Sequence, residues 1–192
     1  MTLALQEPLI EDHLVLLGIS WSQLEALDTV LAEVPGVRLF YLDGFLEIMT
    51  LSLEHEETNG TLRSLIEAYM REKNIRFYIR GSATLGSEET QGRKEPDESY
   101  NLETKKPNPD LVIEVILTSG GLDKLEFYKR IGVREVWFWE DGVITIYHLR
   151  EEYEKVSHSL LLPDLNIDLL SRYVIYYDQY DAVTEFLQAL RK

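Results

Sequence analysis

The sequence predicts an α/β (α+β) fold in which helices flank a mixed central β-sheet that carries β-hairpins. The segment DLVIEVIL (110–117) is almost wholly apolar and β-branched, as expected for a strand buried on both faces. A helical segment and a second strand follow it, and a crossover helix normally joins parallel neighbours. Two Asp-Gly pairs, Asp43-Gly44 and Asp141-Gly142, lie between β-rich runs. Such pairs indicate hairpin turns, because both residues tolerate positive φ.

The first part of the chain should contain a tail, a helix and a hairpin. The tail is expected over residues 1–19. The helix follows it, because apolar side chains recur at helical spacing up to a Pro-Gly pair, with Ser20 or Ser22 as the N-cap. The run 37–51 then forms the first hairpin.

The next part begins with a long amphipathic helix over Ser52–Lys73. Residues 75–87 predict one or two strands broken at Gly81. The segment SEETQGRKE (87–95) is polar and is expected to be mobile, and residues 96–103 are expected to be extended.

After the buried strand, a helix should open at Gly120-Gly121 and close at Gly132. The second hairpin follows, then a strand within 153–162 and a C-terminal helix within 176–192. No repeat or linker divides the chain, so the prediction is a single domain over all 192 residues.

Composition excludes several classes of site. The chain is 45% hydrophobic and 28% charged, which is typical of a globular protein. It has no cysteine, so it has no disulfide, thiolate metal site or cysteine nucleophile, and a cytoplasmic location is expected. Its four histidines lack a zinc-ligand spacing. No uncharged run is long enough to span a membrane, so no membrane is expected as a partner.

The net charge of −15 argues against general nucleic-acid binding, which requires clustered Lys and Arg. The charge is unevenly distributed. Residues 63–134 carry thirteen basic and twelve acidic side chains, whereas residues 1–62 carry one and eleven. An anionic substrate is therefore expected to approach the middle of the chain.

Glu114 stands out as a lone carboxylate among Leu, Val and Ile. Burying a carboxylate is costly unless it is paired or bound to a metal, and a salt bridge to Lys or Arg is the alternative to a metal. Asp97 lies upstream in an extended segment that could pair beside this strand, although a solvated surface position is its alternative. Two carboxylates on adjacent strands are suitable oxygen ligands for Mg²⁺.

Five segments together resemble the Uma-type restriction endonuclease family, a bacterial branch of the PD-(D/E)XK nuclease superfamily. They are DGFLEIM, SLEHEE, EPDESY, PDLVIEV and SGGLDKLEFYKRIGVREVWFWEDG. The resemblance runs from Val37 to Leu149. It implies a restriction-endonuclease-like core, a Mg²⁺ or Mn²⁺ cofactor and DNA as the substrate.

By this resemblance, Asp97 and Glu114 bind the metal. The superfamily motif places a lysine two residues after the glutamate, where this chain has Ile116. In the Uma-type branch the lysine lies on the next helix, which corresponds to Lys124. Such a cation would orient the attacking water or stabilise charge on phosphorus, and a solvent-facing helix position is the alternative.

The resemblance also points to Glu47 as a third metal ligand and to His55 as a proton or phosphate contact. Their alternatives are a solvent-facing strand position and a polar residue at a helix start. Asp110 and Asp164 also follow prolines. Asp110 begins the strand that carries Glu114, and both are expected to lie outside the site, whereas Glu95 and Glu98 are expected to be solvated.

The function predicted is Mg²⁺-dependent hydrolysis of DNA phosphodiester bonds. The alternative is a catalytically inactive relative that serves as a homodimeric binding or assembly module built on the second hairpin. The aromatic run Trp137, Phe138, Trp139 with Tyr147 is expected to form core or dimer contacts rather than to stack on bases, because successive strand residues point to opposite faces.

Overall fold

The computed structural model describes residues 12–117 and 123–191, and in these ranges the chain forms two β-sheets and five helices. The N-terminal sheet is antiparallel, with strand order β1-β3-β2-β6-β5. Its strands are β1 (Asp12–Leu17), β2 (Val37–Leu42), β3 (Phe45–Thr50), β5 (Leu85–Ser87) and β6 (Gly92–Lys94).

The central sheet is mixed, with strand order β11-β10-β9-β8-β7-β4. Its strands are β4 (Phe77–Ile79), β7 (Glu98–Leu102), β8 (Leu111–Ile116), β9 (Glu135–Glu140), β10 (Val143–Leu149) and β11 (Tyr153–Val156). The pair β8–β9 is parallel and is joined through a helix, whereas the other described pairs are antiparallel. The predicted α+β class with a mixed central sheet is confirmed.

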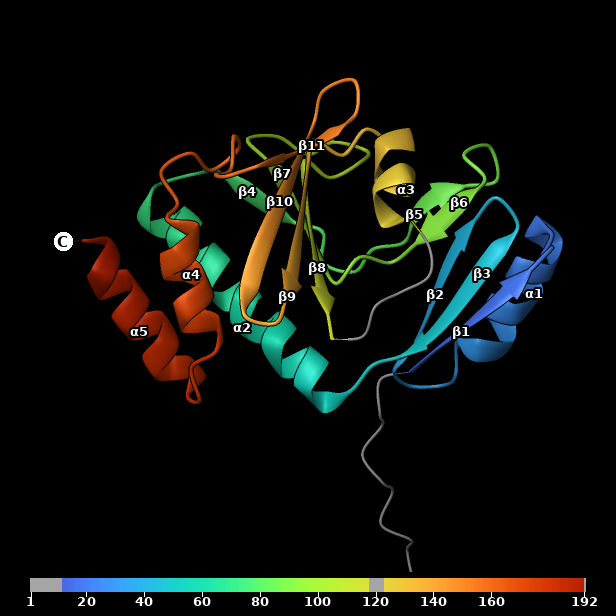
Figure 1. The fold of residues 1–192 in the computed structure, drawn as a ribbon, viewed down its shortest axis with the longest axis horizontal. Coiled ribbons are helices and arrows are strands. Elements are labelled where there is room, and N and C mark those ends of the chain that lie inside the picture. The colour runs from blue at the N-terminus through green and yellow to red at the C-terminus, as the bar shows by residue number, and fades with distance from the viewer. Residues whose placement is uncertain (1–11, 118–122, 192) are drawn as a thin grey trace, which may run out of the picture.

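One helix lies between the two sheets, and the other helices cover their outer faces (Figure 1). They are α1 (Trp21–Leu31), α2 (Leu53–Glu72), α3 (Lys124–Arg130), α4 (Ile167–Val174) and α5 (Gln179–Leu190). Helices α2, α4 and α5 pack on one face of the central sheet, α3 lies between the two sheets, and α1 packs on the N-terminal sheet. None of the described helices combines the length and apolarity needed to cross a membrane.

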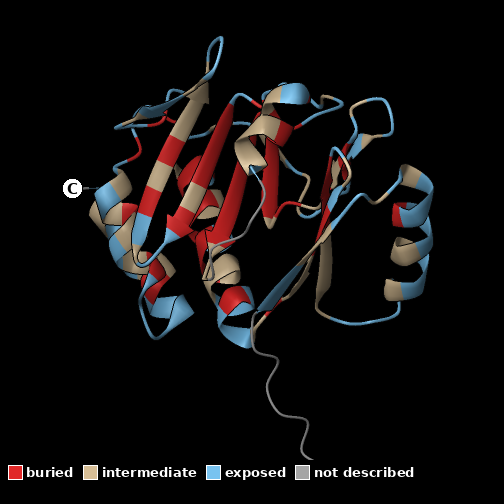
Figure 2. Cartoon of the chain, turned by 45° about the vertical axis from the view of Figure 1, so that its right-hand side comes forward, coloured by how far each residue is buried: buried red, intermediate tan, exposed pale blue. Residues whose placement is uncertain are grey.

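Strand alternation builds two apolar layers around the central sheet. The odd-numbered residues of β8 and β9, such as Ile113 and Trp137, join the α2, α4 and α5 side chains in the largest core cluster. The even-numbered residues Val112 and Val136 pack instead against Phe127 of α3 and the N-terminal sheet. Figure 2 shows the resulting burial of the middle strands. The face that carries Glu114 therefore lies between the sheets.

Local signals identified most element boundaries. The hydroxyl of Ser20, rather than that of Ser22, accepts the N-cap hydrogen bond of α1 from Gln23. Asp43 and Asp141 adopt positive φ angles of 49° and 48° in the two predicted hairpin turns. The C-terminal helix is present as α5.

Several expectations need correction. The predicted tail contains β1, which pairs with β3; the rest of it up to residue 11 lies outside the described residues. The helix start expected at Gly120-Gly121 also lies outside them. The two strands around Gly81 join different sheets, and the segment expected to be polar and mobile contains β6. These short strands have too few residues for a periodic sequence signal, and long-range pairing decides them.

The β5–β6 hairpin depends on Gly86, which has a φ of +90°. A Cβ there would lie 2.0 Å from the Gly92 carbonyl oxygen, which is backbone and cannot move aside. We expect Gly86→Ala to lower the free energy of unfolding by about 2–3 kcal/mol in urea denaturation. Gly142→Ala is the matched control, because Gly142 has a φ of +81° but open space around its Cα. Equal losses in both variants would show that the close contact is unimportant.

Candidate metal and phosphate site

Glu114 is fully buried on β8 and is surrounded by donors. Its Oε2 lies 3.1 Å from Nζ of Lys94 and 3.0 Å from Nζ of Lys124. Its Oε1 accepts a short hydrogen bond from the Tyr128 hydroxyl. These contacts offset the cost of burying the carboxylate. The salt bridge foreseen as an alternative to a metal site therefore exists, and it involves two lysines.

Asp97 lies just before β7, which runs antiparallel to β8. The register pairs Glu98 with Ile113, so one further step would place Asp97 opposite Glu114. Asp97 Oδ2 accepts a hydrogen bond of 2.8 Å from the Val115 backbone N–H. The sheet thus holds the Asp97 carboxylate beside the strand that carries Glu114, as the sequence predicted.

His55 contacts Asp97 from the first turn of α2. Its Nε2 lies 3.1 Å from Asp97 Oδ1, and its imidazole is buried. Burial acts to raise the pKa of Asp97, but the hydrogen bond to His55 and the charges of His55, Lys94 and Lys124 outweigh it and lower that pKa. Asp97 is thereby kept as a carboxylate, and His55 is placed to orient it.

The two lysines differ in environment although they contact the same oxygen. Burial lowers the pKa of Lys94, despite the opposing charge of Glu114. Burial also acts to lower the pKa of Lys124, but the charges of Glu114 and Asp97 outweigh it, so that this pKa is raised. Lys124 is therefore the stable cation of the site, and its side chain keeps 12% exposure.

Lys94 enters the site from the N-terminal sheet and was not predicted as a site residue. In the sheet register, Phe40 pairs with both Glu47 and Lys94, so one row crosses β3, β2 and β6. Lys94 Nζ lies 5.4 Å from the centroid of the Phe40 ring. The absence of the motif lysine at Ile116 was accounted for by Lys124, so no sequence signal pointed to a second lysine beside Glu114.

Glu47 is fully buried in the same row, so it does not face solvent. Its charge contributes to the raised pKa of Lys124, which places it within electrostatic reach of the cluster. Within the described residues, no set of three or more acidic or histidine side chains is close enough to hold a metal ion. Asp97 and Glu114 are thus the carboxylate pair of the site, with Glu47 beside it.

A small cavity opens onto this cluster and is lined by both carboxylates, both lysines and His55. Arg38 also lines it and extends into a neighbouring groove of about 310 Å³. Arg63 lies in the same groove, beside Glu98. The groove is also lined by Glu56, Asp97 and Glu98, so Arg38 and Arg63 supply local positive charge without making the groove positive as a whole.

The other acidic candidates lie outside the cluster. Asp110 accepts hydrogen bonds from Lys106 Nζ and from the Leu102 backbone N–H, and Asp164 is exposed. Glu95 is partly exposed near Arg38. Glu98 differs from expectation, because it is buried rather than solvated, and its burial raises its pKa to about 7.

A comparison with known families agrees with this geometry. The Uma2 family model, described as "Putative restriction endonuclease", matches residues 21–171. The chain belongs to the Uma2 family. A comparison with curated proteins gave no match. The matched range of this Uma2 protein contains both sheets except β1, and it contains all the residues of the cluster. The restriction-endonuclease-like fold expected from the sequence is therefore confirmed.

Proposed function

We propose that this Uma2 protein is a metal-dependent endonuclease that hydrolyses DNA phosphodiester bonds. The observation that carries the proposal is the pairing of Asp97 and Glu114 at one end of adjacent strands, where both carboxylates and Lys124 line the same small cavity. We also infer that residues 1–192 act as one nuclease-like domain, because side chains of both sheets line this cavity.

The donor set fits a hard divalent cation, because buried carboxylate oxygens suit Mg²⁺ or Mn²⁺. Asp97 and Glu114 would hold the ion. Glu47 is proposed as the third oxygen ligand and would have to move closer to serve as one, because no three acidic or histidine side chains of the described residues are close enough as they stand. The ion supplies Lewis acidity at the phosphate when bound. Lys94 and Lys124 neutralise Glu114 in its absence, so they would compete with the ion for that oxygen.

The remaining side chains have separate roles in this proposal. Lys124 reaches the cavity and would stabilise the negative charge that develops on the phosphate. Tyr128 and Lys94 orient Glu114 from opposite sides, and His55 orients Asp97. The protein thus presents a preorganised arrangement in which Lys124, rather than a lysine at position 116, acts on the substrate.

Cleavage assays test this proposal. Supercoiled plasmid and single-stranded DNA are incubated with the protein and Mg²⁺ or Mn²⁺. We expect Asp97→Asn to abolish cleavage and Lys124→Met to reduce its rate by at least about 100-fold. Asp164→Asn is the matched control, because Asp164 also follows a proline but is exposed, and it should cleave at the wild-type rate. Equal cleavage rates for Asp97→Asn and the wild type would refute the proposal that this site hydrolyses DNA.

A catalytically inactive binding or assembly module is the second candidate. It is favoured by the neutralisation of Glu114 by two lysines and by the absence of a three-ligand set among residues 12–117 and 123–191. It predicts no cleavage and no metal-dependent rise in thermal stability, whereas a bound ion at 100 times its Kd would stabilise the fold by about 2.7 kcal/mol. A homodimer on the second hairpin would have to use residues other than Trp137 and Trp139, which are buried.

The cysteine-free composition supports the cytoplasm as the proposed location, since cysteine-free chains need no oxidising compartment.

A further inference from the structure

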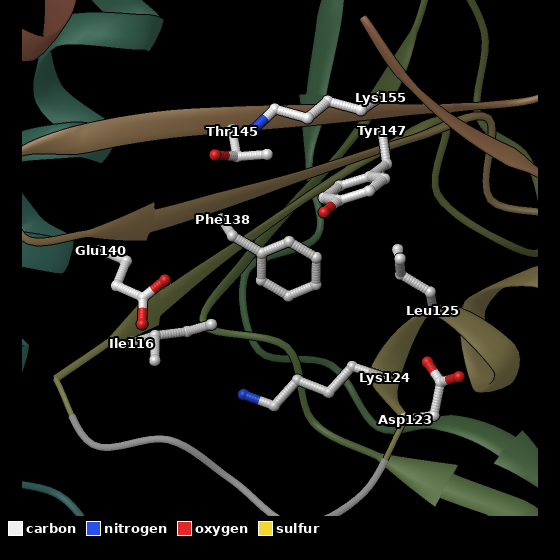
Figure 3. Close-up of a pocket in the computed structure, with 9 residues that line it drawn as sticks. All are labelled: Ile116, Asp123, Lys124, Leu125, Phe138, Glu140, Thr145, Tyr147 and Lys155. Atoms are coloured by element: carbon white, nitrogen blue, oxygen red, sulfur yellow. The ribbon is translucent and has the colours of Figure 1, made fainter.

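A pocket of about 410 Å³ lies next to the carboxylate cluster, between the central sheet and the start of α3, as formed by the described residues (Figure 3). Its apolar side includes Ile116, Phe138 and Tyr147. Its charged residues are two acids and two lysines placed around the pocket: Asp123, Lys124, Glu140 and Lys155. Of the residues that line the pocket, the roles proposed above use only Lys124.

Register connects this pocket to the proposed catalytic site. Phe138 pairs with Glu114 across the parallel strands β8 and β9, and both side chains lie on the same sheet face. Neighbouring strands are about 4.8 Å apart. Lys124 lines the pocket and also contacts Glu114. A group bound over Phe138 would therefore lie about one strand spacing from Glu114.

The two aromatic rings of the pocket are partly exposed and lie together. The Phe138 and Tyr147 centroids are 5.8 Å apart, with an interplanar angle of 78°. Trp137 and Trp139 flank Phe138 in the sequence but point into the opposite core. The expected core contacts are made in full by the tryptophans, whereas Phe138 packs at the edge of the core between the sheets and, like Tyr147, stays partly exposed.

Flat apolar rings beside charged groups suit a planar ligand with polar edges and an attached phosphate. Base faces stack on aromatic rings with little dependence on sequence. Figure 3 shows the Phe138 ring among Tyr147, Ile116 and Lys124, with the Glu140 carboxylate beyond Ile116. Glu140 would accept hydrogen bonds from a base amino group, and Lys124 and Lys155 would attract phosphates.

We propose that this pocket holds an unpaired nucleobase next to the scissile phosphate, which makes single-stranded or locally unpaired DNA the preferred substrate. This inference rests on the proposed nuclease function. A base inside a duplex is stacked on both faces and must leave the stack before it can occupy such a pocket. The pocket would therefore favour DNA strands in which the base is already unpaired and unstacked.

The test uses a short single-stranded oligodeoxynucleotide that carries 2-aminopurine, whose fluorescence falls when the base stacks. It is titrated with the full chain in EDTA, so that binding is measured without cleavage. We expect binding with quenching by the wild type. Phe138→Leu, which preserves most of the apolar volume, should raise the Kd by about 5-fold to 100-fold and remove the quenching. Tyr177→Leu is the matched control, because it removes a fully exposed aromatic ring outside the pocket and should match the wild type.

Cleavage of single-stranded and duplex DNA by the same variants separates the pocket from the nuclease. If the wild type cleaves DNA and Phe138→Leu still binds the oligonucleotide as the wild type does, the proposed base-binding role of the pocket is wrong and the proposed nuclease function stands. Loss of quenching in Phe138→Leu without any wild-type cleavage would support base binding and reject the nuclease. If the wild type does not bind the oligonucleotide, the proposal that this pocket holds a nucleobase is wrong. A wild-type preference for duplex over single strands would also contradict it.

Discussion

Replacing Glu114 with alanine is expected to lower the free energy of unfolding by about 3–5 kcal/mol and to abolish DNA cleavage. The carboxylate is buried and contacts both Lys94 and Lys124. Its removal leaves the buried Lys94 side chain without its direct ion-pair partner, and it also removes the acceptor of the Tyr128 hydroxyl. Urea denaturation measures the first effect, and plasmid cleavage measures the second.

The double variant Glu114→Leu with Lys94→Met separates stability from function. Replacing a buried ion pair with apolar side chains of similar volume is often neutral or stabilising, because no charge remains to be desolvated. We expect this double variant to regain part of the stability lost in Glu114→Ala, since Lys124 and the Tyr128 hydroxyl still lack the carboxylate, and to stay inactive. An additive loss from the two substitutions would show that the Lys94–Glu114 pair does not couple the two sheets energetically.

Glu135→Ala is expected to cause a loss of similar size, about 3–5 kcal/mol, at the opposite end of the central sheet. Glu135 is fully buried at the start of β9. Its carboxylate accepts hydrogen bonds from five groups. They are the backbone N–H groups of Leu160 and Leu161, the Ser159 hydroxyl, the Trp137 indole N–H and a His148 ring nitrogen. Without the carboxylate, several of these buried groups lose their partner.

The hydrogen bonds to Glu135 fix the segment that leads from β11 to α4 against the sheet. The loss should appear in thermal and urea unfolding. Glu140→Ala on the same strand is the matched control, because Glu140 is exposed, and it should change stability by less than about 0.5 kcal/mol. If Glu135→Ala unfolds at the same temperature and urea concentration as the wild type, water replaces the carboxylate without a loss of stability.

The two buried glutamates show how far sequence reasoning reaches. Glu114 was predicted as a site residue, since a charged residue within an apolar strand must be compensated. Glu135 has the same burial, but it begins its strand next to Arg134, so its sequence context is ordinary. Its partners lie far along the chain, at Ser159 and beyond, and nothing in the sequence identifies them.

The sequence by itself determined the elements whose side chains repeat with a clear period or turn signal. These include the buried strand β8, the long helix α2 and both Asp-Gly hairpins. It also predicted that Asp97, Glu114 and Lys124 belong together, and the structure brings them together. Local patterns were sufficient for these elements and for Glu114, because burial, strand alternation and turn geometry act over a few residues, whereas Asp97 and Lys124 were predicted from the family resemblance.

Only the tertiary structure decided the second sheet, the position of Lys94 and the pocket around Phe138. The three-residue strand β6 carries no periodic signal, and it forms because β2 and β5 pair with it. Lys94, on the N-terminal sheet, then contacts Glu114, on the central sheet. No spacing in the sequence indicates that these two residues lie together. Phe138 was expected in core or dimer contacts because of its aromatic neighbours, but it packs only at the edge of the core between the sheets and stays partly exposed beside the pocket. Long-range packing determines which faces are covered, and a single sequence does not reveal it.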